Sequence, residues 1–347
     1  MNNNIRSLFP VLKSCTYLNT AYAGLLSTEL FDFRKKLEND YLVKGDVFKI
    51  DSHERISDFR DTISKFINSS KENTFFTSNF STGYRYILDL LPKKSKILAL
   101  ENDYNSLLEG LKEREFMVDY IPITSDFELQ IEKQLHKNNY NVLAISVVQF
   151  LSGIKVDFKV LRKIKHAFPK LTIVGDSTQF VGSDIFDFNN SPFDVVIGSG
   201  YKWMLAGFGN AYMAVSEDFL NHTKSSSKSL YEKVYAGHIN FLGSASLDFA
   251  IKFLQKNNFE SLIQQKNDLG VFLGDELKKM KLLDPQVEKR DDHSSIYNII
   301  GVRNLHNELQ KRGVRCSLRG KGVRVSVHFY NQESEVYNLI KILKKLN

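Results

Sequence analysis

Short apolar runs alternate with amphipathic helical patterns along the chain up to about residue 216. The runs cover residues 73–78, 96–101, 140–148, 171–176, 193–200 and 210–216, and most are rich in β-branched residues. Uninterrupted runs of this kind predict strands that are buried on both faces, which is typical of a mostly parallel sheet covered by helices. The pattern therefore predicts an α/β fold.

The pattern changes after about residue 240. Residues 244–282 have the spacing of a long helical region, and shorter strand-like and helical stretches follow up to the C-terminus. This change predicts a smaller α+β unit at the end of the chain. We expect an N-terminal segment at 1–20, a large domain at 21–240 and a small domain at 241–347.

Composition and length favour an ordinary globular protein. The chain has 347 residues, of which 42% are apolar and 25% charged. No apolar run approaches the roughly 18–20 residues of a membrane span, and the N-terminus lacks the apolar core of a secretory signal. Cys15 and Cys316 form neither a disulfide framework nor a metal-ligand set. We therefore expect a cytoplasmic protein with no bound metal and no membrane contact.

The formal charge of +7 raises the possibility of nucleic-acid binding. The lysines are dispersed along the chain, usually beside acids or at the ends of elements, and they build no concentrated basic arm. We expect no nucleic-acid partner. A basic surface also favours anionic small molecules.

The residues that follow the predicted strands indicate the chemistry, because ligands of such sheets bind at the carboxyl ends of the strands. The chain has no P-loop, no G-x-G-x-x-G turn, no H-E-x-x-H pair and no G-x-S-x-G elbow, which argues against the enzymes that use them. Asp176 ends one predicted strand and Lys202 follows another. A carboxylate with a lysine that can lose its proton suits pyridoxal phosphate. The alternatives are a helix-capping Asp176 and a Lys202 on a surface turn.

The region from Tyr140 to Ser216 resembles the class V aminotransferases, which belong to the fold type I enzymes that use pyridoxal 5′-phosphate. The similarity lies in DSTQ (176–179), in SGYK (199–202) and in the glycine-rich LAGFG turn before a strand. The family includes cysteine desulfurases, selenocysteine lyases and isopenicillin N epimerase-like proteins. The resemblance implies a large domain with a mostly parallel sheet of the seven-stranded type, a smaller α+β domain, and a homodimer.

The resemblance also implies roles for individual residues at the cofactor. Lys202 would form the Schiff base and later act as general base, while Asp176 would hold the pyridine nitrogen protonated. Gln179 would bind the ring hydroxyl, Tyr104 would stack on the ring, and the remaining expected cofactor-binding residues are Phe80, Ser81, Gln149, Ser199 and Tyr201. Simpler interpretations stay open: Tyr104 on a surface turn, Ser81 as a helix cap, and Gln149 satisfying backbone groups.

The expected substrate is a small amino acid or amine. By resemblance, Arg324 would bind its α-carboxylate, although it could also be a surface strand residue, and Asn19 and Ala21 lie in the segment that lines the pocket. His238 matches a region through which a neighbouring subunit often contributes to the phosphate site.

Two departures from the family leave the reaction open. Tyr201 replaces a common histidine, and the chain around Cys316 is too short for the loop that carries the catalytic cysteine of desulfurases. We therefore expect a transaminase or lyase, with Cys316 a structural thiol and persulfide-type cysteine desulfuration disfavoured. The alternative is a non-catalytic or regulatory protein that uses the same pocket for binding.

Overall fold

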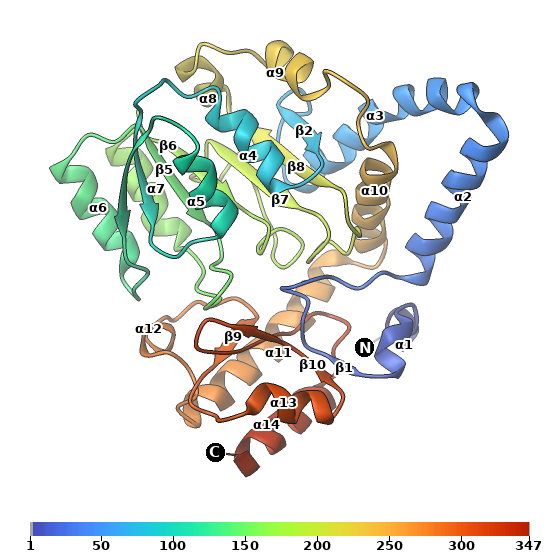
Figure 1. Ribbon diagram of the computed structural model, residues 1–347, viewed down its shortest axis with the longest axis vertical. Helices are drawn as coiled ribbons and strands as arrows, with labels where there is room; N and C mark the ends of the chain where they lie inside the picture. The colour runs from blue at the N-terminus through green and yellow to red at the C-terminus, as the bar shows by residue number, and fades with distance from the viewer. Residues whose placement is uncertain (1–2, 347) are drawn as a thin grey trace.

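The computed structural model describes residues 3–346, and its centre is a seven-stranded mixed sheet. Every neighbouring pair is parallel except the pairs formed by β8, which runs antiparallel to both its neighbours. The strands lie in the order β2 (Thr74–Thr77), β8 (Ala211–Val215), β7 (Val195–Ser199), β6 (Thr172–Asp176), β5 (Val142–Ser146), β3 (Lys96–Leu100) and β4 (Met117–Ile121). The predicted α/β fold is confirmed, and Figure 1 shows the sheet between its covering helices.

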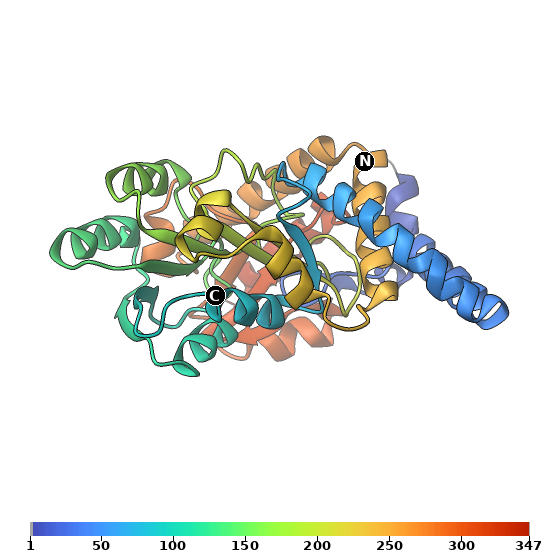
Figure 2. The same cartoon turned by 90° about the horizontal axis from the view of Figure 1, so that it is seen from above.

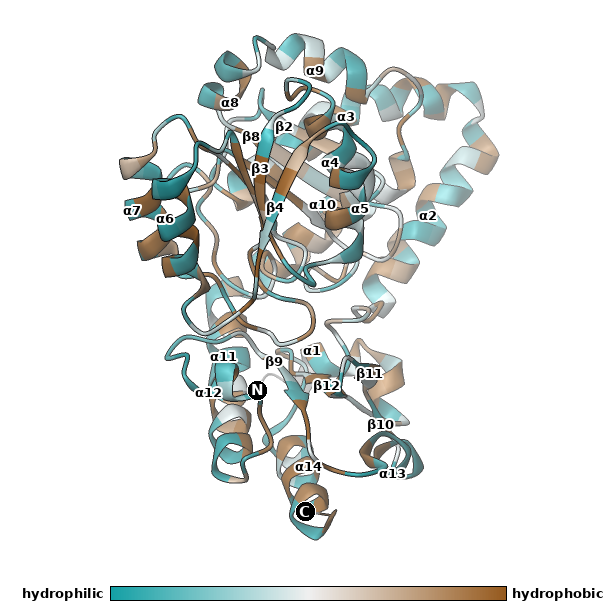
Figure 3. Cartoon of the chain, turned by 60° about the vertical axis from the view of Figure 1, so that its left-hand side comes forward, coloured by the Kyte–Doolittle hydropathy of each residue, from teal (hydrophilic) through white to brown (hydrophobic). Residues whose placement is uncertain are grey.

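Successive residues of each central strand face opposite sides of the sheet, so two cores form. Leu98 and Leu143 pack on one side, whereas Ile97 and Val142 pack on the other. The first core includes α3 (Asp46–Phe66), α6 (Phe127–Lys137), α7 (Phe158–Ala167) and α10 (Phe241–Lys256), and the second includes α4 (Phe80–Leu88), α5 (Asn105–Lys112), α8 (Glu217–His222) and α9 (Ser227–Val234). Figure 3 shows the hydrophobic colour concentrated on strands between helices.

The edge strand β4 is not among the strands expected from the sequence. Met117, Asp119 and Tyr120 are exposed, and only Ile121 of this strand is buried. An edge strand has one neighbour and needs fewer apolar residues, so its apolar pattern is weak. The sequence therefore predicted the buried strands and missed the partly solvated one.

The C-terminal part forms a second layer below the large sheet (Figure 1). Its antiparallel sheet has the order β11 (Ser317–Arg319), β12 (Gly322–Ser326) and β9 (Ile296–Ile299). Around it lie α11 (Phe259–Lys279), α12 (Pro285–Glu288), α13 (Leu305–Lys311) and α14 (Glu333–Leu346). The long helical region expected at 244–282 is two helices, α10 and α11, separated at Asn257 and Asn258, where Asn258 has a φ of 57°.

The N-terminal segment packs against this C-terminal part. After α1 (Asn3–Ser7) and a 3₁₀ turn η1 (Pro10–Lys13), β1 (Thr16–Tyr17) pairs in parallel with β10 (Val314–Arg315). Phe9 contacts Phe329 and Tyr330 through their rings. The chain then passes to α2 (Thr28–Lys44), which forms a long hairpin with α3 that extends away from the sheet (Figure 2). The expected domain limits stay a prediction.

No helix within residues 3–346 is long and apolar enough to cross a membrane.

Candidate active site

A cavity of about 150 Å³ lies at the carboxyl ends of β5, β6 and β7. These strands are neighbours and parallel, so the residues that follow them meet at one edge of the sheet. The lining residues are Asn79, Phe80, Ser81, Tyr104, Ser146, Val148, Phe150, Asp176, Thr178, Gln179, Ser199, Tyr201 and Lys202. Most of the residues predicted to bind the cofactor are thus gathered in one place.

Lys202 lies in the turn after β7 and is only 6% exposed. Its Nζ is 5.5 Å from the ring centroid of Tyr201 and 5.8 Å from that of Tyr104. Burial lowers the pKa of Lys202 from 10.5 to about 8, although the nearby Asp176 carboxylate opposes this shift. A larger fraction of the amine is therefore unprotonated near neutral pH than in an exposed lysine, as imine formation requires.

Asp176 is the last residue of β6 and is buried in the same cavity. Burial raises its pKa to about 6, whereas hydrogen bonding from Thr178 and the charge of Lys202 lower it. The backbone N–H of Thr178 donates to Asp176 Oδ1 over 2.9 Å. A buried carboxylate in this position can bind a protonated ring nitrogen, and that cation would favour its ionised form.

The N-terminus of α4 forms one wall of the cavity. Asn79 caps the helix by accepting a hydrogen bond from the N–H of Thr82, and the N–H of Phe80 donates to Ser199 Oγ over 3.0 Å. Ser81 is hydrogen bonded to Ser106 through their hydroxyls. A helix N-terminus with hydroxyl groups beside it suits a phosphate. Sequence reasoning missed Ser106, because a serine in a helical stretch gives no signal of its own.

Aromatic rings form another wall. Tyr104 makes edge-on contacts with Phe80 at 6.0 Å and Phe150 at 5.7 Å between ring centroids. Burial raises the pKa of Tyr104, so its hydroxyl stays protonated. Its ring is close to the Lys202 amine, as expected for a residue that stacks on the cofactor. Phe150 was not among the predicted residues.

Arg324 lies on β12 and is 2% exposed. Its Nη1 donates to the carbonyl of Phe150, which lines the cavity, whereas its Nε has no hydrogen-bond partner in the described chain. No carboxylate within residues 3–346 forms an ion pair with it. Burial lowers its pKa to about 10, and the positive charge of Arg319 adds to that effect. A buried guanidinium without a carboxylate partner can bind an anionic ligand.

Three of the predicted residues hold the cavity together from outside or at its rim. Gln179 accepts a hydrogen bond from Trp203 Nε1 over 2.8 Å and donates to the carbonyl of Ala21 over 2.9 Å. The side-chain oxygen of Gln179 is thus already hydrogen bonded within the protein, and only the second N–H of its amide is left for the hydroxyl of the cofactor ring. The N–H of Ala21 donates to Ser326 Oγ, and the side-chain oxygen of Asn19 accepts from the Ser317 hydroxyl. Asn19 and Ala21 do not line the cavity; they tie it to the small sheet.

Gln149 is 1% exposed, and both of its side-chain amide atoms lack a hydrogen-bond partner of normal geometry in the described chain. Burial raises the pKa of the neighbouring Asp103, and the Gln149 side chain is close enough to that carboxyl to oppose the rise. Gln149 follows β5 near Phe150 of the cavity wall, although it does not line the cavity itself. Unpaired amide atoms next to a cavity suit a polar ligand.

The remaining expected residues lie elsewhere. Cys316 is buried, and burial raises its pKa to about 11. It precedes a tight hairpin in which Arg319 pairs with Gly322. His238 contacts His53 and lines a cavity with Thr77, Ser78 and Thr82, near the start of α4. Within residues 3–346, no group of three or more His, Cys, Asp or Glu side chains could hold a metal ion.

The aminotransferase class V family matches residues 44–339 of the chain, which is most of its length. The chain belongs to this family. Among curated proteins it is 25% identical over 312 residues to a cysteine desulfurase SufS of Plasmodium falciparum, a match that covers 75% of this chain and 56% of that protein. It is 20% identical to a probable cysteine desulfurase of Ureaplasma parvum, covering 99% of this chain and 97% of the relative.

Solved structures share the fold at low identity. A cysteine desulfurase from Thermococcus onnurineus superposes with a TM-score of 0.82 at 16% identity, covering 100% of this chain and 98% of the other. The cystine C–S lyase C-DES, in complex with cysteine persulfide, superposes with a TM-score of 0.87 at 15% identity, covering 98% of this chain and 100% of the other. A further C-DES structure carries glycine linked to its pyridoxal phosphate. The fold is that of fold type I enzymes.

Pyridoxal 5′-phosphate is the cofactor of this family, as expected from the sequence. The cavity suits it, because it joins a buried lysine, a buried carboxylate, an aromatic ring and a helix N-terminus, with the unpaired amide of Gln149 beside it.

One expectation was wrong. Persulfide-type cysteine desulfuration was disfavoured because the chain lacks the cysteine-bearing loop. The curated relatives, however, are cysteine desulfurases, and the superposed structures include cysteine desulfurases and a cystine C–S lyase. The shortness of the β11–β12 hairpin is therefore not an argument against this chemistry.

Proposed function

We propose that the protein is a pyridoxal phosphate enzyme of the lyase type that cleaves the C–S bond of cysteine or a closely related α-amino acid. The names of its curated relatives support the substrate class. The observation that carries the proposal is the buried guanidinium of Arg324, which has no carboxylate partner in the described chain and is near the cavity that holds Lys202 and Asp176. An α-carboxylate supplies the missing charge.

In this proposal, different residues of the cavity would bind the cofactor and transfer the proton. Lys202 Nζ would hold the cofactor covalently and, once released by the incoming amine, would move the proton at the substrate Cα. The Asp176 carboxylate would keep the pyridine nitrogen protonated, and the bound cofactor supplies an electron sink for the charge that develops at Cα. The N–H groups of Phe80 and Ser81 and the hydroxyl of Ser199 would bind the phosphate.

Arg324 would orient the substrate so that its Cα proton faces the Lys202 amine. A bidentate pair between guanidinium and carboxylate fixes two atoms of the substrate and excludes water from them. In the overall desulfuration, cysteine and a thiol acceptor give alanine and a persulfide on that acceptor. The atoms balance without an added oxidant.

Product analysis tests the proposal. Purified protein with pyridoxal phosphate should show a visible absorbance band that borohydride removes, and mass spectrometry should find the adduct on Lys202. Cysteine with a thiol acceptor should give alanine and persulfide sulfur, whereas β-elimination from cystine gives pyruvate. Formation of a keto acid from amino acids without sulfur release would instead indicate a transaminase. A protein that takes up no cofactor would contradict the proposal and favour a binding protein.

We also propose that the active form is a homodimer, since fold type I enzymes are often dimeric. The tip of the α2–α3 hairpin supports this: it exposes Tyr41, Leu42, Val43, Val47 and Ile50 on a part of the molecule that extends from the sheet (Figure 2). Light scattering should give twice the chain mass, and Leu42→Glu should shift the protein toward the monomer if this tip lies in the interface.

A further inference from the structure

A second deeply buried lysine lies outside the active-site cavity. Lys266, on α11, is 2% exposed, and its Nζ has one hydrogen-bond partner within the described chain, Ser183 Oγ at 3.1 Å. None of the ion pairs found within residues 3–346 includes Lys266. Burying an ammonium without a counter-ion is costly, so a lysine in this position calls for an anion or the loss of its proton.

Lys266 lines a cavity of about 170 Å³ together with Ser183 and His293. A water molecule takes about 30 Å³, so the space suits a small oxyanion with some water. Lys155 and Asp184 also line this cavity, but they pair with each other at 3.3 Å, and Lys155 also pairs with Asp292 at 2.7 Å. Asp292 lines the cavity too, so two carboxylates share the one charge of Lys155, whereas within the described residues Lys266 lies beyond ion-pair distance of both.

His293 adds an acceptor to the same cavity. Its Nδ1 is 2.8 Å from the carbonyl oxygen of Ser294 and so carries the proton, while its Nε2 is buried and has no hydrogen-bond partner of normal geometry in the described chain. Burial lowers the pKa of His293 to about 4, which keeps the ring neutral at pH 7. A neutral Nε2 accepts a hydrogen bond from a ligand hydroxyl.

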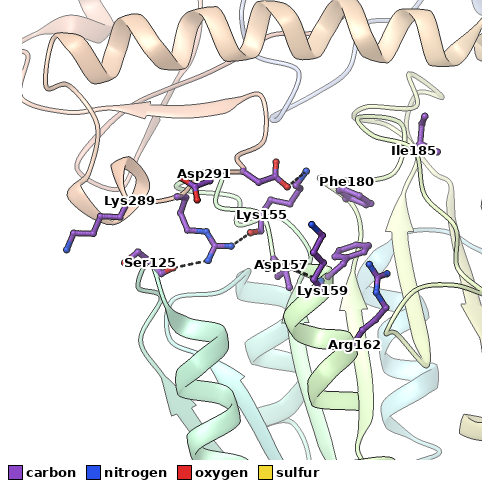
Figure 4. Close-up of a pocket in the computed structure, with 13 residues that line it drawn as sticks. Ser125, Lys155, Asp157, Lys159, Arg162, Phe180, Ile185, Lys289 and Asp291 are labelled. Carbon is purple, nitrogen blue, oxygen red and sulfur yellow. Dashed lines mark hydrogen bonds and ion pairs between the residues drawn. The ribbon is translucent and has the colours of Figure 1, made fainter. Parts of the chain in front are cut away.

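The cavity adjoins a larger groove of about 580 Å³, with which it shares the lining residues Lys155, Phe180 and Asp292. Figure 4 shows Lys159 and Arg162 extending from the start of α7 on one side of the groove and Lys289 on the other. These three side chains are exposed and form no ion pair in the part of the chain that the structure describes. Cations at the rim of a groove raise the local concentration of anions.

We propose that Lys266, Ser183 and His293 form a second ligand site, for a small oxyanion that keeps one proton, such as hydrogen phosphate or a phosphate monoester. Two oxygens accept from the Lys266 ammonium and the Ser183 hydroxyl, and the P–OH group donates to His293 Nε2. A carboxylate lacks that donor, so it binds less well. The ligand enters through the groove lined by Lys159, Arg162 and Lys289.

The site is placed to affect the catalytic turn. Lys266 Nζ is 5.8 Å from the ring centroid of Trp203, the residue after Lys202, and Trp203 Nε1 donates to Gln179 at the active-site cavity. Trp203 is also the only tryptophan of the chain. An anion that draws the ammonium away from the indole changes the surroundings of this single fluorophore.

The test is a titration of the holoenzyme, with its cofactor-phosphate site filled, by sodium phosphate at fixed pH and ionic strength while Trp203 emission is followed. We expect a saturable change with phosphate and at least tenfold weaker binding of acetate. Lys266→Met should weaken phosphate binding at least tenfold, whereas Lys278→Met, an exposed lysine on the same helix, should leave it unchanged.

Ser183→Ala keeps the ammonium and removes its hydroxyl partner, so it should weaken phosphate binding several-fold even if Lys266→Met fails to fold. Absence of a saturable change in the wild-type protein would overturn the proposal, as would equal affinities of wild type, Lys266→Met and Ser183→Ala. Acetate binding as tight as that of phosphate would overturn the role of His293 as acceptor. None of these measurements depends on turnover.

Discussion

Two buried lysines adjoin Trp203, and their surroundings differ. Lys202 follows a strand of the large sheet and shares its cavity with the buried carboxylate of Asp176 and two tyrosine rings. Lys266 comes from a helix, and its cavity offers a hydroxyl, a neutral imidazole and a lysine that is already paired with two carboxylates, Asp184 and Asp292. Burial lowers the pKa of both lysines from 10.5 to about 8.

The comparison shows that a lowered lysine pKa does not by itself identify a catalytic amine. Desolvation acts on any buried ammonium. What sets Lys202 apart is a carboxylate, Asp176, that forms no ion pair within the described residues, together with the helix N-terminus that suits a phosphate and the Arg324 guanidinium, which has no carboxylate partner there either. Lys266 has a donor and an acceptor around it and no group suited to a pyridine ring, so its surroundings suit a small anion.

Substitution of each lysine should show the largest difference between them. Lys202→Ala should abolish covalent retention of pyridoxal phosphate and lower turnover by at least about 10²–10⁴-fold, because it removes both the attachment point and the general base. Lys266→Met should keep the covalent cofactor, as mass spectrometry after borohydride would show. Full activity of Lys202→Ala would contradict the assignment and favour the non-catalytic alternative.

Arg324→Gln tests the substrate end of the Lys202 cavity. Loss of a charge-assisted pair costs about 1.5–3 kcal/mol, so KM for the amino acid should rise about 10- to 150-fold. Arg315→Gln is the matched control, because Arg315 is exposed on β10, a strand outside the sheet that carries Arg324. An unchanged KM for Arg324→Gln, measured by steady-state kinetics, would remove Arg324 from the carboxylate site.

The backbone supports of the two lysines should also differ. A Cβ on Gly24 would lie 2.0 Å from the carbonyl oxygen of Lys202, so Gly24→Ala should destabilise the fold by about 1–3 kcal/mol in urea unfolding. A Cβ on Gly270 would meet the side chain of Ser295. Because that side chain can rotate away, Gly270→Ala should destabilise the fold less than Gly24→Ala. Gly237→Ala, with no atom within 4 Å, is the control. Equal costs at Gly24 and Gly237 would refute this contact.

The most gradual effect expected is a dependence of stability on pH, spread over several pH units. Burial lowers the pKa of Lys266 to about 8 in the folded protein, against an ordinary value of 10.5. Between these two pH values Lys266 is therefore protonated in the unfolded chain and largely deprotonated in the folded protein. The free energy of unfolding should therefore rise with pH across this window, by at most about 1.4 kcal/mol per pH unit. Lys266→Met should flatten the rise, as denaturation at several pH values would show. If the free energy of unfolding rose equally with pH in the wild type and in Lys266→Met, Lys266 would not be the source of the rise.

The cofactor cavity could be predicted largely from the sequence. The buried strands have continuous β-branched runs, and the carboxyl ends of parallel strands must meet at one edge. Asp176, Ser199 and Lys202 follow such strands, so their proximity is a consequence of the order of elements. Gln179 was harder to predict, because its side-chain oxygen accepts from Trp203, which is distant in sequence and gives no local pattern.

Other features left no readable signal. The edge strand β4 is solvated on most of its residues, and Phe150 enters the cavity through a turn. Lys266 lies in a helix rich in charged residues, where nothing in the spacing distinguishes it from the exposed Lys278. The shortened hairpin near Cys316 suggested a limit on the chemistry, and the cysteine desulfurases among the relatives overturned that expectation.

The sequence by itself determined the α/β fold, the family and the placement of Asp176 and Lys202 in one cavity, because strand patterns and short motifs are local and strand ends converge by geometry. Only the tertiary structure decided which charges are buried without an ion-pair partner among the described residues. Arg324 and Lys266 are placed by packing between distant segments, and the free energy of a charge depends on what surrounds it in space. That dependence is why two lysines with similar pKa values can serve different ligands.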